Sequence, residues 1–88
     1  MTLADDAAQL DDIANKYVHT LELMNAAIYG LEINRGDVMA VAGKNETAVH
    51  VGITSRTTDL VKEITDVQRK VKLTQAFIRS VATRIRSI

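Results

Sequence analysis

The sequence contains no cysteine, no proline and no tryptophan, and only 3% of its 88 residues are aromatic. Without cysteine the chain cannot hold a disulfide framework, an iron–sulfur cluster, a cysteine-ligated zinc ion or a thiol nucleophile. No uninterrupted stretch of about 18 apolar residues occurs, so we expect no membrane span. The acidic start, Met1-Thr2-Leu3-Ala4-Asp5-Asp6, is unlike the basic start of a secretory signal. We therefore expect a cytoplasmic chain or one exported without a cleaved signal.

What the sequence does contain is aliphatic and charged. Hydrophobic residues make up 47% of the chain and charged residues 25%, a composition typical of folded rather than disordered proteins. The core must therefore be built from Ile, Leu, Val and Ala. A chain of this length has room for one small domain, so we predict a single domain over residues 1–88.

The net charge of zero conceals two oppositely charged halves. Residues 1–43 carry seven acidic and two basic residues, a net charge of −5, and residues 44–88 carry nine basic and four acidic residues, a net charge of +5. Either the halves neutralise each other within one molecule, or the acidic end of one subunit meets the basic end of another.

Apolar residues recur in both halves at alternating spacings of four and three, the heptad pattern of packed α-helices. In the first half the members of this seam are Leu3, Ala7, Leu10, Ala14, Tyr17, Leu21, Met24, Ile28 and Leu31. In the second half we assign Leu60, Ile64, Val67, Val71, Thr74, Ile78, Val81, Ile85 and Ile88. Two long helices are therefore predicted.

The two seams also predict how the helices pair. In an antiparallel pair, facing residues have a constant sum of residue numbers. A sum of 88 pairs Ala7 with Val81 and Leu10 with Ile78, and it places the fold point at Lys44, within the turn-like segment Gly43-Lys44-Asn45-Glu46. We predict an all-α, antiparallel two-helix hairpin that resembles a coiled coil, with helices over about 3–35 or 3–42 and about 54–88.

The ends of the predicted helices differ in how well local signals define them. Thr2 and Asp5 have the spacing of an N-terminal capping box, which predicts a helix start near residue 3. The tip, residues 36–53, is ambiguous because Gly36 and Gly52 are symmetric about the fold point and either could end a helix. A helical tip is slightly favoured over a short β-hairpin or an irregular segment.

Apolar residues also lie beside the seams, which makes the apolar stripe wider than one partner helix can cover. An exposed stripe of this kind marks an association surface. We therefore expect a homo-oligomer, either a four-helix dimer or a larger array. Its predicted interface residues are Ile13, Val18, Ala27, Val61, Phe77 and Ala82.

No residue pattern points to catalysis, a metal or a cofactor. His19 and His50 are the only histidines, and the predicted hairpin places them far apart. The carboxylate pairs near the N-terminus are expected to start the helix and pair with Arg79 and Arg84 rather than bind cations. A basic partner-binding face is a further candidate, with Arg69, Lys70, Lys72, Arg79, Arg84 and Arg86. Nucleic acid is not the expected partner, because few aromatic residues are free to stack on bases.

The segment Leu10-Asp11-Asp12-Ile13-Ala14-Asn15-Lys16-Tyr17 resembles the start of the first helix in needle and inner-rod subunits of bacterial type III secretion systems. The acidic first helix, the mid-chain turn and the basic, branched-aliphatic C-terminal helix are similar to that family as well. The resemblance implies export without a cleaved signal, polymerisation into a tube, and other secretion-apparatus proteins or a chaperone as partners. The rival interpretation is a small dimeric helical hairpin of the kind that serves as an adaptor, an export chaperone or an RNA-binding regulator.

Overall fold

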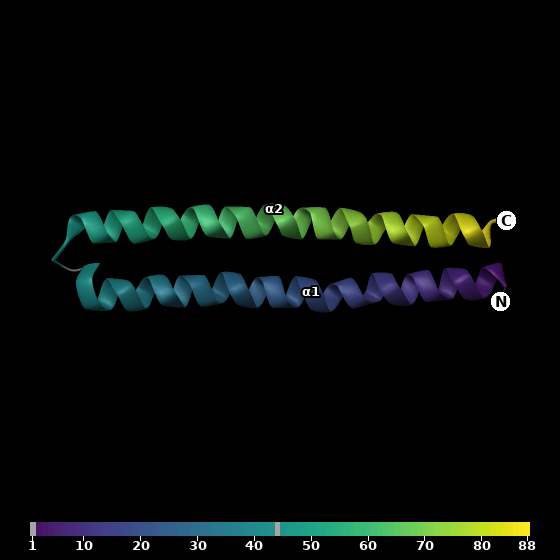
Figure 1. Cartoon of the computed structure of the whole chain (residues 1–88), viewed down its shortest axis with the longest axis horizontal. Helices are drawn as coiled ribbons and strands as arrows, with labels where there is room; N and C mark the ends of the chain where they lie inside the picture. Colours follow the sequence, from purple (N-terminus) through teal and green to yellow (C-terminus); the bar gives the residue numbers. More distant parts are fainter. Residues whose placement is uncertain (1, 44) are drawn as a thin grey trace. The chain divides into compact units, whose positions relative to one another are not determined.

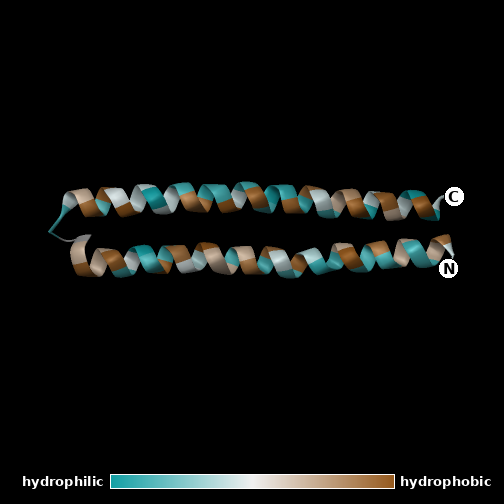
Figure 2. Cartoon of the chain, in the orientation of Figure 1, coloured by the Kyte–Doolittle hydropathy of each residue, from teal (hydrophilic) through white to brown (hydrophobic). Residues whose placement is uncertain are grey.

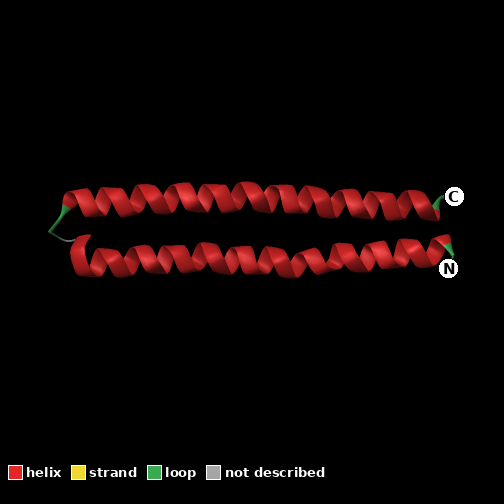
Figure 3. Cartoon of the chain, viewed as in Figure 1, coloured by secondary structure: helices red, strands yellow, loops and turns green. Residues whose placement is uncertain are grey.

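The computed structural model describes residues 2–43 and 45–88. Helix α1 spans Leu3–Val38, the π-helical turn η1 spans Met39–Gly43, and helix α2 spans Thr47–Arg86 (Figure 1). Figure 3 shows helix on both sides of the connection and no strand in the part of the chain that is described. The predicted all-α antiparallel hairpin is confirmed.

The start of α1 is the predicted capping box. The Asp5 backbone N–H donates to the Thr2 hydroxyl oxygen at 3.1 Å, and the Thr2 backbone N–H donates to Asp5 Oδ2 at 3.3 Å. These two bonds satisfy amide groups that have no partner inside the first helical turn. Asp5 also places negative charge at the positive end of the helix dipole.

The tip is helical, so the β-hairpin alternative is wrong. Gly36 lies inside α1, and Gly52 lies inside α2, which begins at Thr47 rather than near residue 54. None of the described glycines has a positive φ, so neither Gly36 nor Gly52 adopts the left-handed conformation that often ends a helix. The predicted fold point at Lys44 lies outside the described residues, and Asn45 next to it is in a turn.

Replacing Gly36 by alanine tests this helical tip. A Cβ atom at Gly36 would meet nothing within 4 Å, so Gly36→Ala is expected to raise the free energy of unfolding by about 0.5–1 kcal/mol in urea denaturation. Gly52→Ala is the comparison, because its Cβ would lie 3.0 Å from Nη1 of Arg56 and the gain should be smaller. Destabilisation by Gly36→Ala would contradict a helix through this position.

The chain divides into two compact units, one formed by Met1–Leu23 with Gln68–Ile88 and the other by Met24–Val67. In the first, which we call the terminal unit, the first turns of α1 lie beside the last turns of α2 (Figure 1). In the second, which we call the tip unit, the end of α1 and the start of α2 are joined by η1 and the turn.

The seam predicted for α1 is the face of this helix that is covered. Ala7 and Ala14 are fully buried, and the other members from Leu10 to Leu31 are half-buried. Leu3 is the exception, because it is 49% exposed in the first turn of the helix.

The seam predicted for α2 is only partly correct. Ile64, Val71, Ile78, Val81 and Ile85 are half-buried as expected. The predicted Leu60, Val67 and Thr74 are exposed, and neighbouring residues are covered instead. The covered positions there are Thr57, Val61, Gln68, Gln75 and Ala82, while Leu60 and Val67 are each 45% exposed and the last predicted member, Ile88, is 90% exposed.

The physical reason is visible in the terminal unit. Gln75 is buried and its Nε2 donates a hydrogen bond of 2.9 Å to the backbone carbonyl of Ala14. Because this bond satisfies the buried amide, a polar residue is tolerated in the seam. Ala7, Ala14 and Ala82 are fully buried, so small side chains line the close approach of the helices, and the branched Val81 beside Ala82 is half-buried. The layer predicted as Ala7 with Val81 is therefore shifted by one residue.

Candidate self-association surface

The hairpin has very little interior of its own. Its buried hydrophobic residues are Ala7, Ala14 and Ala82, and no large side chain among the described residues is fully buried. Among the residues that the structure describes, fourteen large hydrophobic side chains are exposed, and Figure 2 shows hydrophobic residues recurring along both helices. Large apolar side chains normally supply the stability of a core. In this chain, most of that apolar surface is still exposed to solvent.

The solvent-accessible area of the chain shows how much more surface it exposes than a typical folded monomer. The chain exposes 6370 Å², whereas a folded monomer of 9.7 kDa typically exposes about 5,100 Å². The excess is about 1,200 Å². A stable protein–protein interface removes about 800 Å² from each partner, so the excess is large enough for one such interface.

The six predicted interface residues fall into two groups. Ile13, Val18 and Phe77 are 44%, 45% and 62% exposed, and Ala27 is exposed as well. In contrast, Ala82 is fully buried and Val61 is half-buried, both on the face of α2 that packs within the chain. These last two residues belong to the hairpin seam, so the exposed apolar surface is made by the first group and by residues that were not predicted.

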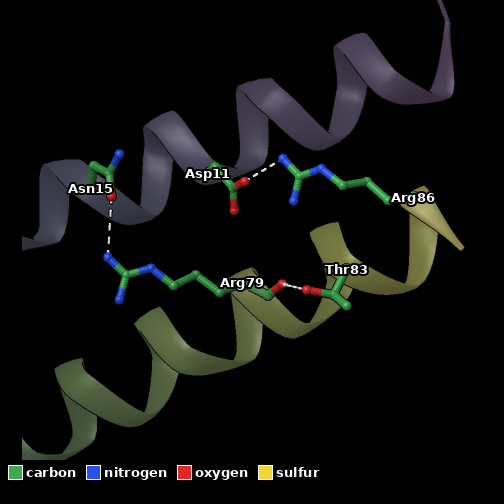
Figure 4. Close-up of polar contacts among 5 residues, drawn as sticks. All are labelled: Asp11, Asn15, Arg79, Thr83 and Arg86. Carbon is green, nitrogen blue, oxygen red and sulfur yellow. Dashed lines mark hydrogen bonds and ion pairs between the residues drawn. The ribbon is translucent and has the colours of Figure 1, made fainter.

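One flank of the seam in the terminal unit is polar. Arg86 donates through Nη2 to a carboxylate oxygen of Asp11, and Arg79 Nη2 donates to Asn15 Oδ1 at 3.1 Å (Figure 4). Both arginines reach from α2 across to α1. We call this side, with Asp11, Asn15, Arg79 and Arg86, the polar flank. The sequence predicted cross-helix pairs for Arg79, but its partner is an amide oxygen instead of a carboxylate.

The other flank of the same unit is apolar. Helical periodicity places Ile13 of α1 and Val81 of α2 on the side of the seam opposite the polar flank. Leu73, Phe77 and Val81 follow one another at spacings of four and are therefore neighbours on the surface of α2. We call Ile13, Phe77 and Val81 the apolar flank, and Leu73 continues it onto the outer surface of α2. Leu73, which is 64% exposed, was not predicted, although its spacing from Phe77 was a usable signal.

The six basic residues proposed as one binding face occupy three rows of α2. Lys72, Arg79 and Arg86 are seven residues apart and follow the polar flank, where two of them contact α1. Lys70 and Arg84 lie on the row of Phe77, on either side of it. Arg69 lies between these rows. The basic charge is therefore divided between the two flanks.

The histidines and acidic residues were the candidates for a metal site. His19 and His50 are both exposed. The described residues contain no group of three or more His, Asp or Glu side chains arranged to hold a metal ion. In the described part of the chain, neither long helix has a stretch apolar enough to cross a bilayer.

Comparisons with known proteins identify no relative of this chain. No protein-family model, curated protein or solved structure matches the chain.

Proposed function

We propose that the chain is a non-enzymatic structural subunit that works by assembling with copies of itself. The observation that carries the proposal is the contrast between a core of three alanines and an exposed set of large apolar side chains. Removing apolar surface from water contributes about 25 cal/mol per Å², so this surface gives a strong drive to associate. A surface of this kind is typical of subunits whose stability is completed by assembly.

We propose a secretion apparatus as the setting of this activity, because the segment Leu10–Tyr17 resembles needle and inner-rod subunits. In that setting the partners are further copies of the chain, other proteins of the apparatus and a chaperone. The second candidate is a discrete four-helix dimer that acts as an adaptor, an export chaperone or an RNA-binding regulator. It is supported by the exposed Lys70 and Arg84 on α2, which leave cations available to an acidic partner.

Sedimentation velocity over a concentration series tests the proposal. We expect a dimer or larger species well below about 100 µM, because an exposed apolar surface this wide associates at lower concentrations. A chain that stays monomeric and helical at that concentration would contradict self-assembly. Electron micrographs of the purified protein separate the two forms, since a secretion-type subunit gives tubes or filaments and an adaptor gives small discrete particles.

The RNA-binding alternative has its own measurement. Titration with RNA at physiological salt should show only weak binding if assembly is the function. Sub-micromolar, salt-sensitive affinity that falls when Arg69, Lys70 and Lys72 are all replaced by glutamine would favour the regulator instead. Loss of three phosphate contacts would flatten the dependence of log affinity on log salt by about three.

A further inference from the structure

We infer that the apolar flank of the terminal unit is the surface on which a second copy packs, with α1 of each copy facing α2 of the other. This inference rests on the proposed self-association and specifies its surface and its pairing. The polar flank is a poorer surface for the same contact, because its arginines are already bonded to Asp11 and Asn15 across the helix pair.

The levels of the apolar residues fit this pairing. The hydrogen bond between Gln75 and Ala14 fixes which turns of α1 and α2 are level with each other. Ile13 lies one residue before Ala14, and Phe77 lies two residues after Gln75. Since the helices are antiparallel, both are displaced toward the start of α1, by about 1.5 Å and about 3 Å. A two-fold axis parallel to the helices keeps these levels and sets Ile13 against Phe77 of the second copy.

The charges beside the apolar residues also fit the pairing of α1 of one copy with α2 of the other. Asp6 lies about 12 Å from the level of Ala14, and Arg84 lies about 13.5 Å from the level of Gln75, again in the same direction. Neither forms an ion pair with another residue that the structure describes. In the proposed pairing, Asp6 of each copy approaches Arg84 of the other, so opposite charges border the apolar contact on both sides of the axis.

The alternative pairing, with α2 against α2, is unfavourable. Lys70 and Arg84 lie seven residues before and seven residues after Phe77, on the same row of the helix. A two-fold axis perpendicular to α2 at Phe77 would therefore bring Lys70 of one copy against Arg84 of the other. The segment of α2 in the terminal unit carries six basic residues and no acidic one, so nothing on that surface would offset the repulsion.

A matched pair of substitutions tests the surface. Ile13 and Val18 are both branched residues of α1, 44% and 45% exposed, on opposite flanks of the seam. Ile13→Asp is expected to raise the dissociation constant of the dimer about a hundredfold, because the contact would bury an unpaired carboxylate. Val18→Asp should change it less than about threefold. Far-UV circular dichroism of both variants verifies that each remains helical.

A charge exchange tests the pairing without disturbing any apolar contact. In Asp6→Arg and in Arg84→Glu, each homodimer would hold two like-charge pairs in the proposed arrangement. An equimolar mixture can instead form heterodimers with two opposite-charge pairs. We expect each variant alone to dimerise about tenfold more weakly than the original chain, and we expect the mixture to recover the original affinity at low salt. Native mass spectrometry of the mixture should show mainly heterodimers.

The outcomes separate this inference from the proposed function. Dimers that tolerate Ile13→Asp, or a mixture with no preference for heterodimers, would overturn the inference and leave self-assembly standing. A chain that is monomeric at about 100 µM would overturn both. Loss of association in Ile13→Asp with retention in Val18→Asp, together with preferred heterodimers, would establish the apolar flank and the facing of α1 with α2.

Discussion

A disulfide between cysteines introduced by Leu10→Cys and Ile78→Cys is expected to form within one chain and to raise the free energy of unfolding by about 4 kcal/mol, the value for closing a loop of about 70 residues. The reason is the register fixed by Gln75, which donates to the carbonyl of Ala14. Leu10 lies one turn before Ala14, and Ile78 lies about one turn after Gln75, so the antiparallel pair places them in the same layer. Both are half-buried on the facing sides.

The measurement compares the oxidised and reduced double variant in urea denaturation at one low protein concentration, with non-reducing gel electrophoresis to show that the bridge is intramolecular. Leu10→Cys with Leu73→Cys is the control. Leu73 is 64% exposed and lies on the outer surface of α2, so this second pair should crosslink slowly or between chains. Rapid bridging of the control pair, or only intermolecular bridging of the first pair, would contradict the register.

Features of the fold that depend on local patterns were predictable. The helix start follows from Thr2 and Asp5, whose hydrogen bonds span three residues. The covered face of α1 follows from apolar periodicity, because hydrophobic residues of this helix recur at the alternating spacings of three and four that define the seam. The hairpin itself follows from two seams of similar length on either side of a turn.

The covered face of α2 was not fully predictable, for a physical reason. Hydropathy ranks Leu60 and Val67 above Thr57 and Gln75, yet the latter two are buried, at 4% and 8% exposure. Burial of Gln75 depends on a carbonyl 61 residues away in the sequence. No local pattern encodes a hydrogen bond over that separation, so the polar member of the seam becomes visible only when the two helices are placed together.

The same limit applies to the candidate surface. Exposure of Ile13 and Phe77 could be predicted from their positions beside the seam. Which flank remains apolar could not be predicted from the sequence, because it depends on where Arg79 and Arg86 make their contacts. Ion pairs with the acidic first helix were expected at Arg79 and Arg84, but Arg86 is the residue that pairs with Asp11, and Arg79 donates to Asn15. These contacts cover one side of the helix pair and leave the other to hydrophobic side chains.

Close approach of the two helices at Ala14 leads to the second large expected effect. Ala14 is fully buried, with an exposure of 0%, so Ala14→Leu forces a larger side chain between α1 and α2. Overpacking of this kind typically costs 1–3 kcal/mol, and separation of the helices would also break the hydrogen bond from Gln75, worth about 1 kcal/mol. We expect a loss of about 3 kcal/mol in the free energy of unfolding, a large part of the roughly 4–13 kcal/mol typical of a chain this long.

The control is Ala8→Leu, because Ala8 is exposed on the same helix and leucine is nearly as good a helix former as alanine. Its free energy of unfolding should stay within about 0.5 kcal/mol of the original. Both variants are to be measured by urea denaturation at the same protein concentration, since association adds to the apparent stability. If Ala14→Leu and Ala8→Leu unfold at the same urea concentration, α1 and α2 do not approach closely at Ala14, and the alanine seam would have to be abandoned.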